Sequence, residues 1–152
     1  MLQANQTKEQ GKQPEILVID GQGGGLGKSL ILKIKEVMPN AKVIAIGTNS
    51  VASTTMLKAG ADKVATGENS ILWNASKASV ITGGIGIVCA NSMLGEISPA
   101  MANAVSSSDA SKFLIPMSYC HIRIAGARSF TLPQLIDSTV EEIQEFFQGT
   151  LC

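Results

Sequence analysis

Several residue types are scarce in this chain of 152 residues, and each scarcity excludes a class of protein. The three cysteines lie at positions 89, 120 and 152, and no two of them form a CxxC pair. This odd, widely spaced set argues against a zinc ribbon or a dithiol redox motif, and it favours the cytoplasm over an oxidising compartment. The single histidine, His121, excludes a metal site built from several histidines.

The chain also lacks an excess of charge and a long apolar run. Twelve basic and twelve acidic side chains give a net charge of zero, which argues against nucleic acid or an anionic membrane as the main partner. The longest stretch without charged residues, 78–95, is interrupted by glycines and polar residues, so it does not suit a membrane helix. The polar residues 1–14 lack the apolar region of a signal peptide, and we expect a disordered tail there, followed by one domain over 15–152.

Short β-branched runs alternate with amphipathic segments along this domain. The predicted strands are 16–19, 43–46, 63–65, 79–82, 113–115 and, at a sheet edge, 121–125; the predicted helices are 26–37, 51–59, 68–75, 99–106 and a last one with an apolar face from 136 to 147. The alternation predicts an α/β fold with a doubly wound, mostly parallel sheet of five to six strands. This is a Rossmann-like three-layer sandwich, for which we expect the strand order 3-2-1-4-5.

Glycine is abundant at one point of the chain. Of fifteen glycines, five lie within residues 21–27, between the first predicted strand and the first predicted helix. Bare backbone N–H groups and the positive end of a helix dipole suit a phosphate at this position. The predicted ligand-binding residues of this loop are Asp20, Gly21, Gln22, Gly23, Gly24, Gly25, Leu26, Gly27 and Lys28.

The glycine spacing leaves more than one type of phosphate loop open. The dinucleotide motif GxGxxG fails because Leu26 stands where the third glycine belongs, whereas the GxxxGxG motif of short-chain dehydrogenases fits at Gly21, Gly25 and Gly27. However, the chain has no Tyr-xxx-Lys pair. Residues 24–29, GGLGKS, resemble the end of the P-loop in partition-type ATPases, but neither the fourth nor the fifth strand ends in an acidic residue that could hold magnesium.

The positions at which acidic residues are present or absent bear on which ligand we expect. The carboxylate of Asp20 would repel a phosphate unless Lys28 or a metal ion compensates its charge, or unless the ligand presents a hydroxyl group there. Alternatively, the carboxylate accepts hydrogen bonds from N–H groups of the loop, and we favour this last arrangement. The second strand ends at Thr48 and Asn49 without the acid that usually binds the ribose of NAD. This absence leaves NADP, a mononucleotide or another phosphorylated molecule as the expected ligand.

A second glycine cluster follows the fourth strand. Because the first and fourth strands are neighbours in the expected order, we predict that Gly83, Gly84, Asn91 and Glu96 face the same crevice as the glycine loop. Glu68 and Glu96 are the best candidates for general acid or base, although no spacing pairs them.

Five segments together resemble a family of small bacterial proteins, the domain of unknown function 3842. They are DGQGGG at 20–25, GTNS at 47–50, KAGAD at 58–62, ATGEN at 65–69 and ANSMLGE at 90–96. The resemblance covers about residues 15 to 145. It implies a cytoplasmic, stand-alone, Rossmann-like protein, and it supplies no activity and no catalytic residue.

Three functions therefore remain as hypotheses. The first is a small cytosolic protein that binds a nucleotide, a dinucleotide or a similar phosphorylated ligand through the glycine loop. The second is an enzyme that acts on a phosphorylated metabolite through Glu68 or Glu96, and the third is a P-loop-like NTPase with a divergent Gly-Lys-Ser loop. The size of the chain favours a homodimer, and we expect neither a nucleic acid nor a membrane as partner.

Overall fold

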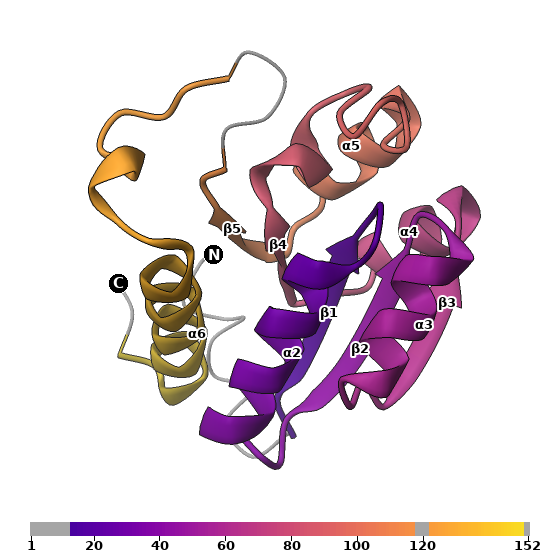
Figure 1. Cartoon of the computed structure of the whole chain (residues 1–152). Coiled ribbons are helices and arrows are strands. Elements are labelled where there is room, and N and C mark those ends of the chain that lie inside the picture. Colours follow the sequence, from indigo (N-terminus) through magenta and orange to yellow (C-terminus); the bar gives the residue numbers. More distant parts are fainter. Residues whose placement is uncertain (1–12, 118–121, 151–152) are drawn as a thin grey trace.

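The computed structural model describes residues 13–117 and 122–150. Five parallel strands form one sheet in the order β3-β2-β1-β4-β5, which confirms the predicted topology (Figure 1). The strands are β1 (Glu15–Asp20), β2 (Lys42–Gly47), β3 (Lys63–Thr66), β4 (Val80–Gly84) and β5 (Ser111–Ile115). The predicted strand at 121–125 is wrong for its described residues, 122–125, which form no strand, and His121 lies outside the described residues.

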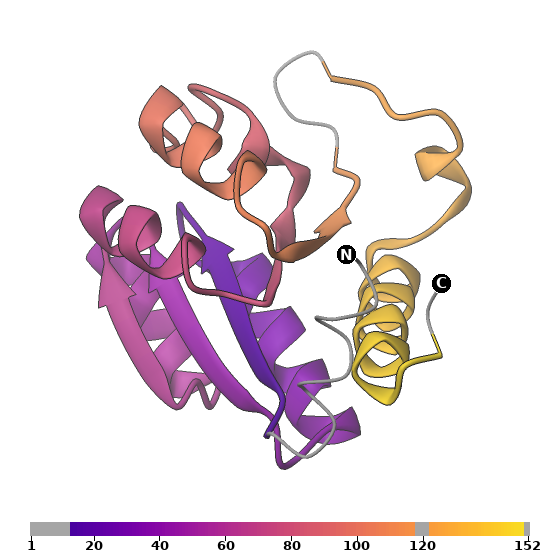
Figure 2. The same ribbon diagram turned by 180° about the vertical axis from the view of Figure 1, so that it is seen from behind.

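Helices cover both faces of the sheet. They are α2 (Gly25–Val37), α3 (Ser50–Lys58), α4 (Glu68–Ala75), α5 (Pro99–Ser106) and α6 (Leu132–Gln148), with short 3-10 turns η1 (Ile85–Val88) and η2 (Ala127–Ser129). Side chains of α2, α3 and α6 share one hydrophobic core with the sheet, and side chains of α4 and α5 share the other. Figures 1 and 2 show these two layers from opposite sides, so the three-layer sandwich is confirmed.

The helices begin where the sequence places their caps. Ser98 Oγ accepts a hydrogen bond from the Met101 N–H at 3.2 Å at the start of α5. Thr131 Oγ1 does the same for the Gln134 N–H at 3.3 Å at the start of α6. Each cap satisfies a backbone donor that the helix leaves without a partner, and a proline in the first turn has no such donor to satisfy.

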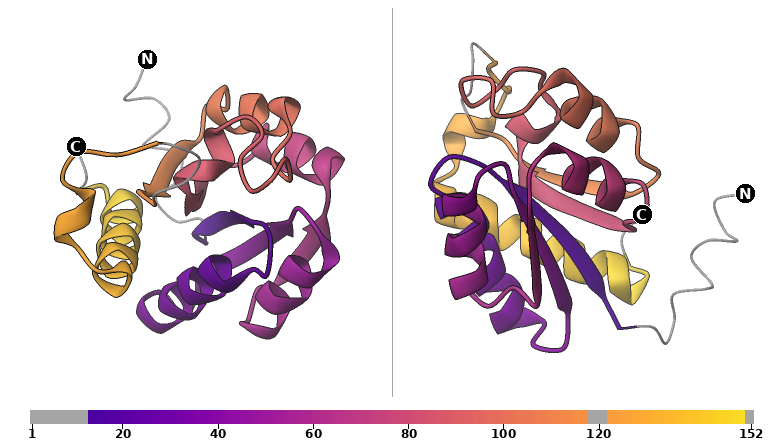
Figure 3. Two further views of the ribbon diagram at one scale, coloured as in Figure 1. Left: turned by 45° about the horizontal axis from the view of Figure 1, so that its top comes forward. Right: turned by 90° about the vertical axis from the view of Figure 1, so that its right-hand side faces the viewer.

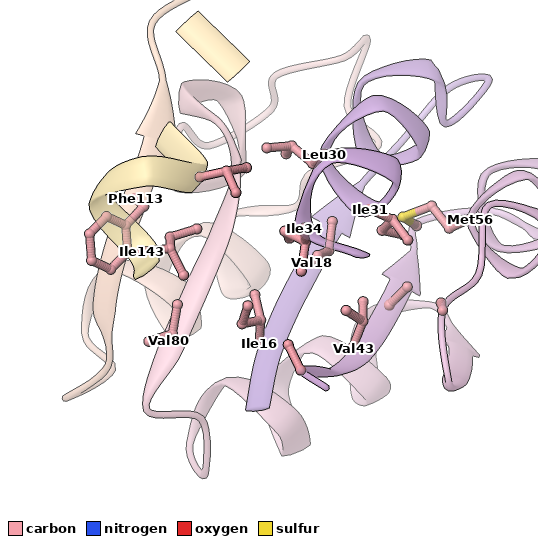
Figure 4. Close-up of a cluster of buried hydrophobic side chains, with 14 of the residues drawn as sticks. Ile16, Val18, Leu30, Ile31, Ile34, Val43, Met56, Val80, Phe113 and Ile143 are labelled. Atoms are coloured by element: carbon pink, nitrogen blue, oxygen red, sulfur yellow. The ribbon is translucent and has the colours of Figure 1, made fainter. Parts of the chain in front are cut away.

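The hydrophobic core between the sheet and the helices α2 and α6 holds β1 firmly in the sheet. Ile16 and Val18 of β1, Leu30 and Ile34 of α2, and Ile143 of α6 are all fully buried (Figure 4). Strands of a parallel sheet are buried on both faces, which explains why β1 is an unbroken apolar run. The loops that follow β1, β2 and β4 therefore start from a rigid base.

None of the helices within the described residues is long and apolar enough to cross a membrane.

Candidate functional site

The loops after β1, β2 and β4 meet at the carboxyl edge of the sheet, which Figure 3 brings forward on its left. The carboxylate of Glu96, from the loop between β4 and α5, joins all three loops. Its Oε1 atom accepts hydrogen bonds from Gln22 N at 3.0 Å, Thr48 Oγ1 at 2.7 Å and Asn49 Nδ2 at 2.6 Å. Asn49 Nδ2 also donates to the carbonyl oxygen of Gln22 at 3.0 Å. The structure thus brings together four predicted site residues from three distant parts of the sequence.

These contacts keep Glu96 ionised. Partial burial acts to raise the pKa of its carboxyl group, but the hydrogen bonds from Thr48, Gln22 and Asn49 outweigh burial and hold the pKa below its ordinary value. Within the described part of the chain, the second carboxylate oxygen, Oε2, has no hydrogen-bond partner. One oxygen is therefore fixed by three donors while the other stays available.

Asp20 is buried under the glycine loop and has the role that we favoured from the sequence. Its Oδ1 atom accepts the N–H of Gly21 at 2.8 Å, and Oδ2 accepts the N–H of Gly27 at 2.7 Å. Burial raises the pKa of Asp20, and these backbone hydrogen bonds oppose the rise. The carboxylate thus connects the end of β1 to the first turn of α2, and both of its oxygens are engaged within the protein.

Three of the five loop glycines are required by the fold. Gly24 has a left-handed φ of 76°, and a Cβ there would lie 2.9 Å from the backbone of Ala52. A Cβ on Gly27 would lie 2.5 Å from Met56 Sδ, so this glycine permits close packing of α2 on α3. A Cβ on Gly21 would lie 2.6 Å from Met93 Sδ.

The other two glycines have no such requirement. Nothing lies within 4 Å of a Cβ built on Gly23 or Gly25, neither has a left-handed φ, and both are exposed. Among the described residues, neither of their N–H groups has a hydrogen-bond acceptor. Gly25 is also the first residue of α2, where the helix dipole is positive. Two N–H groups without an acceptor among the described residues therefore lie on exposed glycines at the point where we predicted a phosphate.

The second glycine cluster is not an open loop, contrary to our expectation. Gly83 and Gly84 are buried inside β4, and a Cβ on Gly83 would lie 2.5 Å from the carbonyl oxygen of Ile19 on β1. Gly83 therefore permits close approach of two strands rather than approach of a ligand. Asn91 is exposed and has no side-chain hydrogen bond to another described residue.

The packing of the loop after β4 against the glycine loop was not predicted from the sequence. Met93 is buried on top of Gly21, and the chain on either side of it takes left-handed φ angles, 64° at Asn91, 57° at Met93 and at Leu94, and 86° at Gly95. Such angles are uncommon outside glycine and asparagine and cluster at functional sites. No local pattern marks Met93 as a site residue, because it packs against Gly21, which is distant in the sequence and belongs to the loop after β1.

The first turn of α2 gives little support to the P-loop alternative. A P-loop presents the N–H groups of its Gly-Lys-Ser end to phosphate, but here the N–H of Gly27 binds Asp20 and the N–H of Lys28 binds the Gly24 carbonyl at 2.9 Å. The hydroxyl of Ser29 donates to the Gly25 carbonyl at 3.1 Å. Lys28 itself is exposed and forms no ion pair with another described residue.

The second candidate acid and one surface cavity make no contact with the carboxylate of Glu96. Glu68, at the start of α4, accepts a short hydrogen bond from Ser98 Oγ. A cavity of about 200 Å³ lies between the end of β5 and α6, and it contains none of the predicted site residues. Arg123 and Arg128 line it together with apolar side chains such as Phe130.

The fold and this edge define a class of protein. A parallel sheet in this order, with helices on both faces and a glycine-rich loop after β1, is the architecture of a Rossmann-like α/β protein. The chain belongs to the family described as Domain of unknown function (DUF3842), whose model matches residues 15–148.

Two further comparisons add little about function. A search of curated proteins finds no significant match. Among solved structures, the chain is similar to a dodecameric FMN-dependent UbiX-like decarboxylase from Escherichia coli O157:H7, with 16% identity and a TM-score of 0.49 over 90% of this chain and 94% of that chain. So distant a likeness says nothing about what this chain binds.

Proposed function

We propose that this protein binds a small phosphorylated ligand, a nucleotide or a related molecule, at the carboxyl edge of its sheet. The observation that carries the proposal is that the N–H groups of Gly23 and Gly25, two exposed residues, have no hydrogen-bond acceptor among the described residues. Gly25 is the first residue of α2, Gly23 directly precedes the N-cap Gly24, and nothing lies within 4 Å of a Cβ built on either glycine. Such donors at a helix N-terminus are suited to a phosphate group.

The charges around the loop are compatible with an anion. Asp20, which the sequence suggested as a repulsive group, is buried and accepts two N–H groups, which offset part of the cost of its charge within the loop. Lys28 follows in the first turn and has no competing ion pair among the described residues. Glu96 lies against Gln22, on the side of the loop that faces β2. We therefore expect the phosphate on the Gly23–Gly25 side.

The test compares ligand binding by the unaltered protein and by Gly25→Val. Isothermal titration with AMP, ATP, NAD, NADP and FMN identifies which nucleotide binds, and thermal unfolding gives an independent readout because a ligand at 100 times its Kd stabilises the folded state by about 2.7 kcal/mol. Since a Cβ at Gly25 meets no protein atom, Gly25→Val should fold normally and lose at least tenfold in affinity.

Ala100→Val is the matched control. Ala100 is exposed in the first turn of α5, so the same side chain is added at another helix start, away from the glycine loop. We expect its affinity to equal that of the unaltered protein. Equal binding by Gly25→Val and Ala100→Val, or no response to any nucleotide or to ribose 5-phosphate, would refute the proposal.

The homodimer and the cytoplasmic location stay predictions. Light scattering of the purified chain tests the first, and fractionation of cells that produce the full chain tests the second.

A further inference from the structure

A carboxylate lies at the end of β2, although the residues that follow β2 in the sequence are not acidic. Rossmann dinucleotide-binding proteins usually carry an acid at this position, where it accepts hydrogen bonds from the ribose hydroxyls. Here β2 is followed by Thr48 and Asn49, whose side chains both donate to Oε1 of Glu96. The carboxylate therefore lies at the end of β2, although it belongs to the loop after β4.

The two oxygens of this carboxylate differ in their surroundings. Oε1 accepts three hydrogen bonds, from Gln22, Thr48 and Asn49, and no further protein donor is needed to fix it. Oε2 has no partner within the described residues, and Glu96 is partly exposed. A carboxylate held by one oxygen presents the other as an oriented acceptor for a ligand donor.

We propose that Glu96 accepts hydrogen bonds from the free hydroxyl groups of a sugar whose phosphate rests on the N–H groups of Gly23 and Gly25. This inference rests on the proposed function and names its ligand class, a sugar phosphate with an unmodified vicinal diol. The sugar is either a free sugar phosphate or the ribose of a nucleotide. A second phosphate on the diol is disfavoured, since it would be placed against an ionised carboxylate.

The protein around Glu96 supports this role. The Gln22 N–H that binds Oε1 belongs to the residue directly before Gly23, so the glycine loop contacts the acid next to the N–H groups proposed for the phosphate. Met93, three residues earlier than Glu96, is buried against Gly21 and anchors the loop that carries the acid. The hydrogen bonds to Oε1 also lower the pKa of Glu96, which keeps it an acceptor at neutral pH.

This inference changes the expected selectivity between dinucleotides. Without an acid at the end of the second strand, the sequence favoured NADP or a mononucleotide over NAD. With Glu96 at that place, a 2′-hydroxyl is accepted and a 2′-phosphate meets a like charge. We therefore expect ligands with a free ribose diol to bind more tightly than their 2′-phosphorylated counterparts.

Glu96→Gln is the variant that separates a structural role from a ligand-binding role. The glutamine carbonyl can retain all three donors at the position of Oε1, while the amide nitrogen replaces Oε2 and donates instead of accepting. The probes are ribose 5-phosphate and 2-deoxyribose 5-phosphate, which need no base-specific contact. NAD and NADP form a second pair, and AMP against ribose 5-phosphate distinguishes a nucleotide from a free sugar phosphate. Affinities come from NMR titration of the isotope-labelled full chain.

The readout is the ratio of affinities within each pair. For the unaltered protein, we expect ribose 5-phosphate to bind about tenfold or more tightly than its 2-deoxy analogue, as for a hydrogen bond to a charged acceptor, and NAD to bind more tightly than NADP. In Glu96→Gln both ratios should fall towards one. A purely structural Glu96 would weaken both members of a pair equally and leave the ratios unchanged, which would overturn the inference.

Failure of the inference is distinguishable from failure of the proposed function. If both sugar phosphates bind equally and Gly25→Val abolishes both, the phosphate site stands and the role of Glu96 is refuted. If none of the sugar phosphates and nucleotides changes any amide signal, both proposals are refuted.

Discussion

Replacing Asp20 by asparagine tests whether its carboxylate holds the glycine loop in place. The two carboxylate oxygens accept the N–H groups of Gly21 and Gly27 at 2.8 and 2.7 Å in a buried setting. An asparagine offers one acceptor oxygen, so one N–H would face the amide NH₂ group and lose its partner. A buried donor left unsatisfied costs about 1–3 kcal/mol, and we expect Asp20→Asn to lower the free energy of unfolding by that amount.

Urea unfolding followed by circular dichroism measures this change. With a denaturant slope of about 2 kcal/mol/M, a loss of 2 kcal/mol lowers the urea midpoint by about 1 M at constant slope. Asp137→Asn is the matched control, because Asp137 is exposed and its ion pair with Lys33, at 3.4 Å, is worth at most about 1 kcal/mol. If Asp20→Asn unfolds at the same urea concentration as Asp137→Asn, the reasoning about Asp20 is wrong.

Three further predictions concern the same edge of the sheet. In thermal unfolding, Gly27→Ala should lower the unfolding free energy by about 1–2 kcal/mol, because the added methyl group clashes with Met56. Gly25→Ala adds a methyl group in open space, so its unfolding free energy should stay the same or rise by up to about 1 kcal/mol. Equal effects of the two substitutions would contradict the packing argument. Because the pKa of Glu96 is lowered on folding, its charge stabilises the folded state above about pH 4.5, and this contribution is lost as the pH falls further. The difference in unfolding free energy between the unaltered protein and Glu96→Gln should therefore shrink between pH 7 and pH 3. A difference that stays constant over this range would contradict the role of the charge. Leu94 is 98% exposed with a φ of 57°, so Leu94→Asn should gain up to about 1 kcal/mol in urea unfolding, and a loss above that size would indicate an unseen contact.

The fold could be predicted from the sequence because its signals are local. The run Ile16–Ile19 and the apolar stripe of α2 each reveal their period within a few residues, and Ser98 with Pro99 marks the start of α5. The predicted strand at 121–125 shows the limit of this reasoning. Isoleucines at 122 and 124 give a β-like alternation, but described residues 122–125 pair with no strand, because pairing depends on a neighbour at the sheet edge.

The site could be predicted only in part, because its decisive contacts join distant residues. The glycine loop is visible in the sequence, yet the sequence does not say which glycines serve packing; that depends on Ala52 and Met56, which α3 brings against the loop. Gly83 was misassigned for the same reason, since the atom that excludes its Cβ belongs to Ile19 on the neighbouring strand. Glycine spacing alone therefore cannot separate a turn from a ligand site.

The clearest case is the acid at the end of β2. The residues after that strand contain no carboxylate, so a reading of consecutive residues excludes a ribose-binding acid there. The fold nevertheless places a carboxylate there, because β4 lies beside β1 and the loop after β4 brings Glu96 to Thr48, 48 positions away, and to Gln22, 74 positions away. A sequence motif misses such a group when a side chain from another loop occupies the position in space that the motif residue would occupy. For a sheet of this topology, the search for a missing ligand group should therefore include the loops after every strand that borders the first.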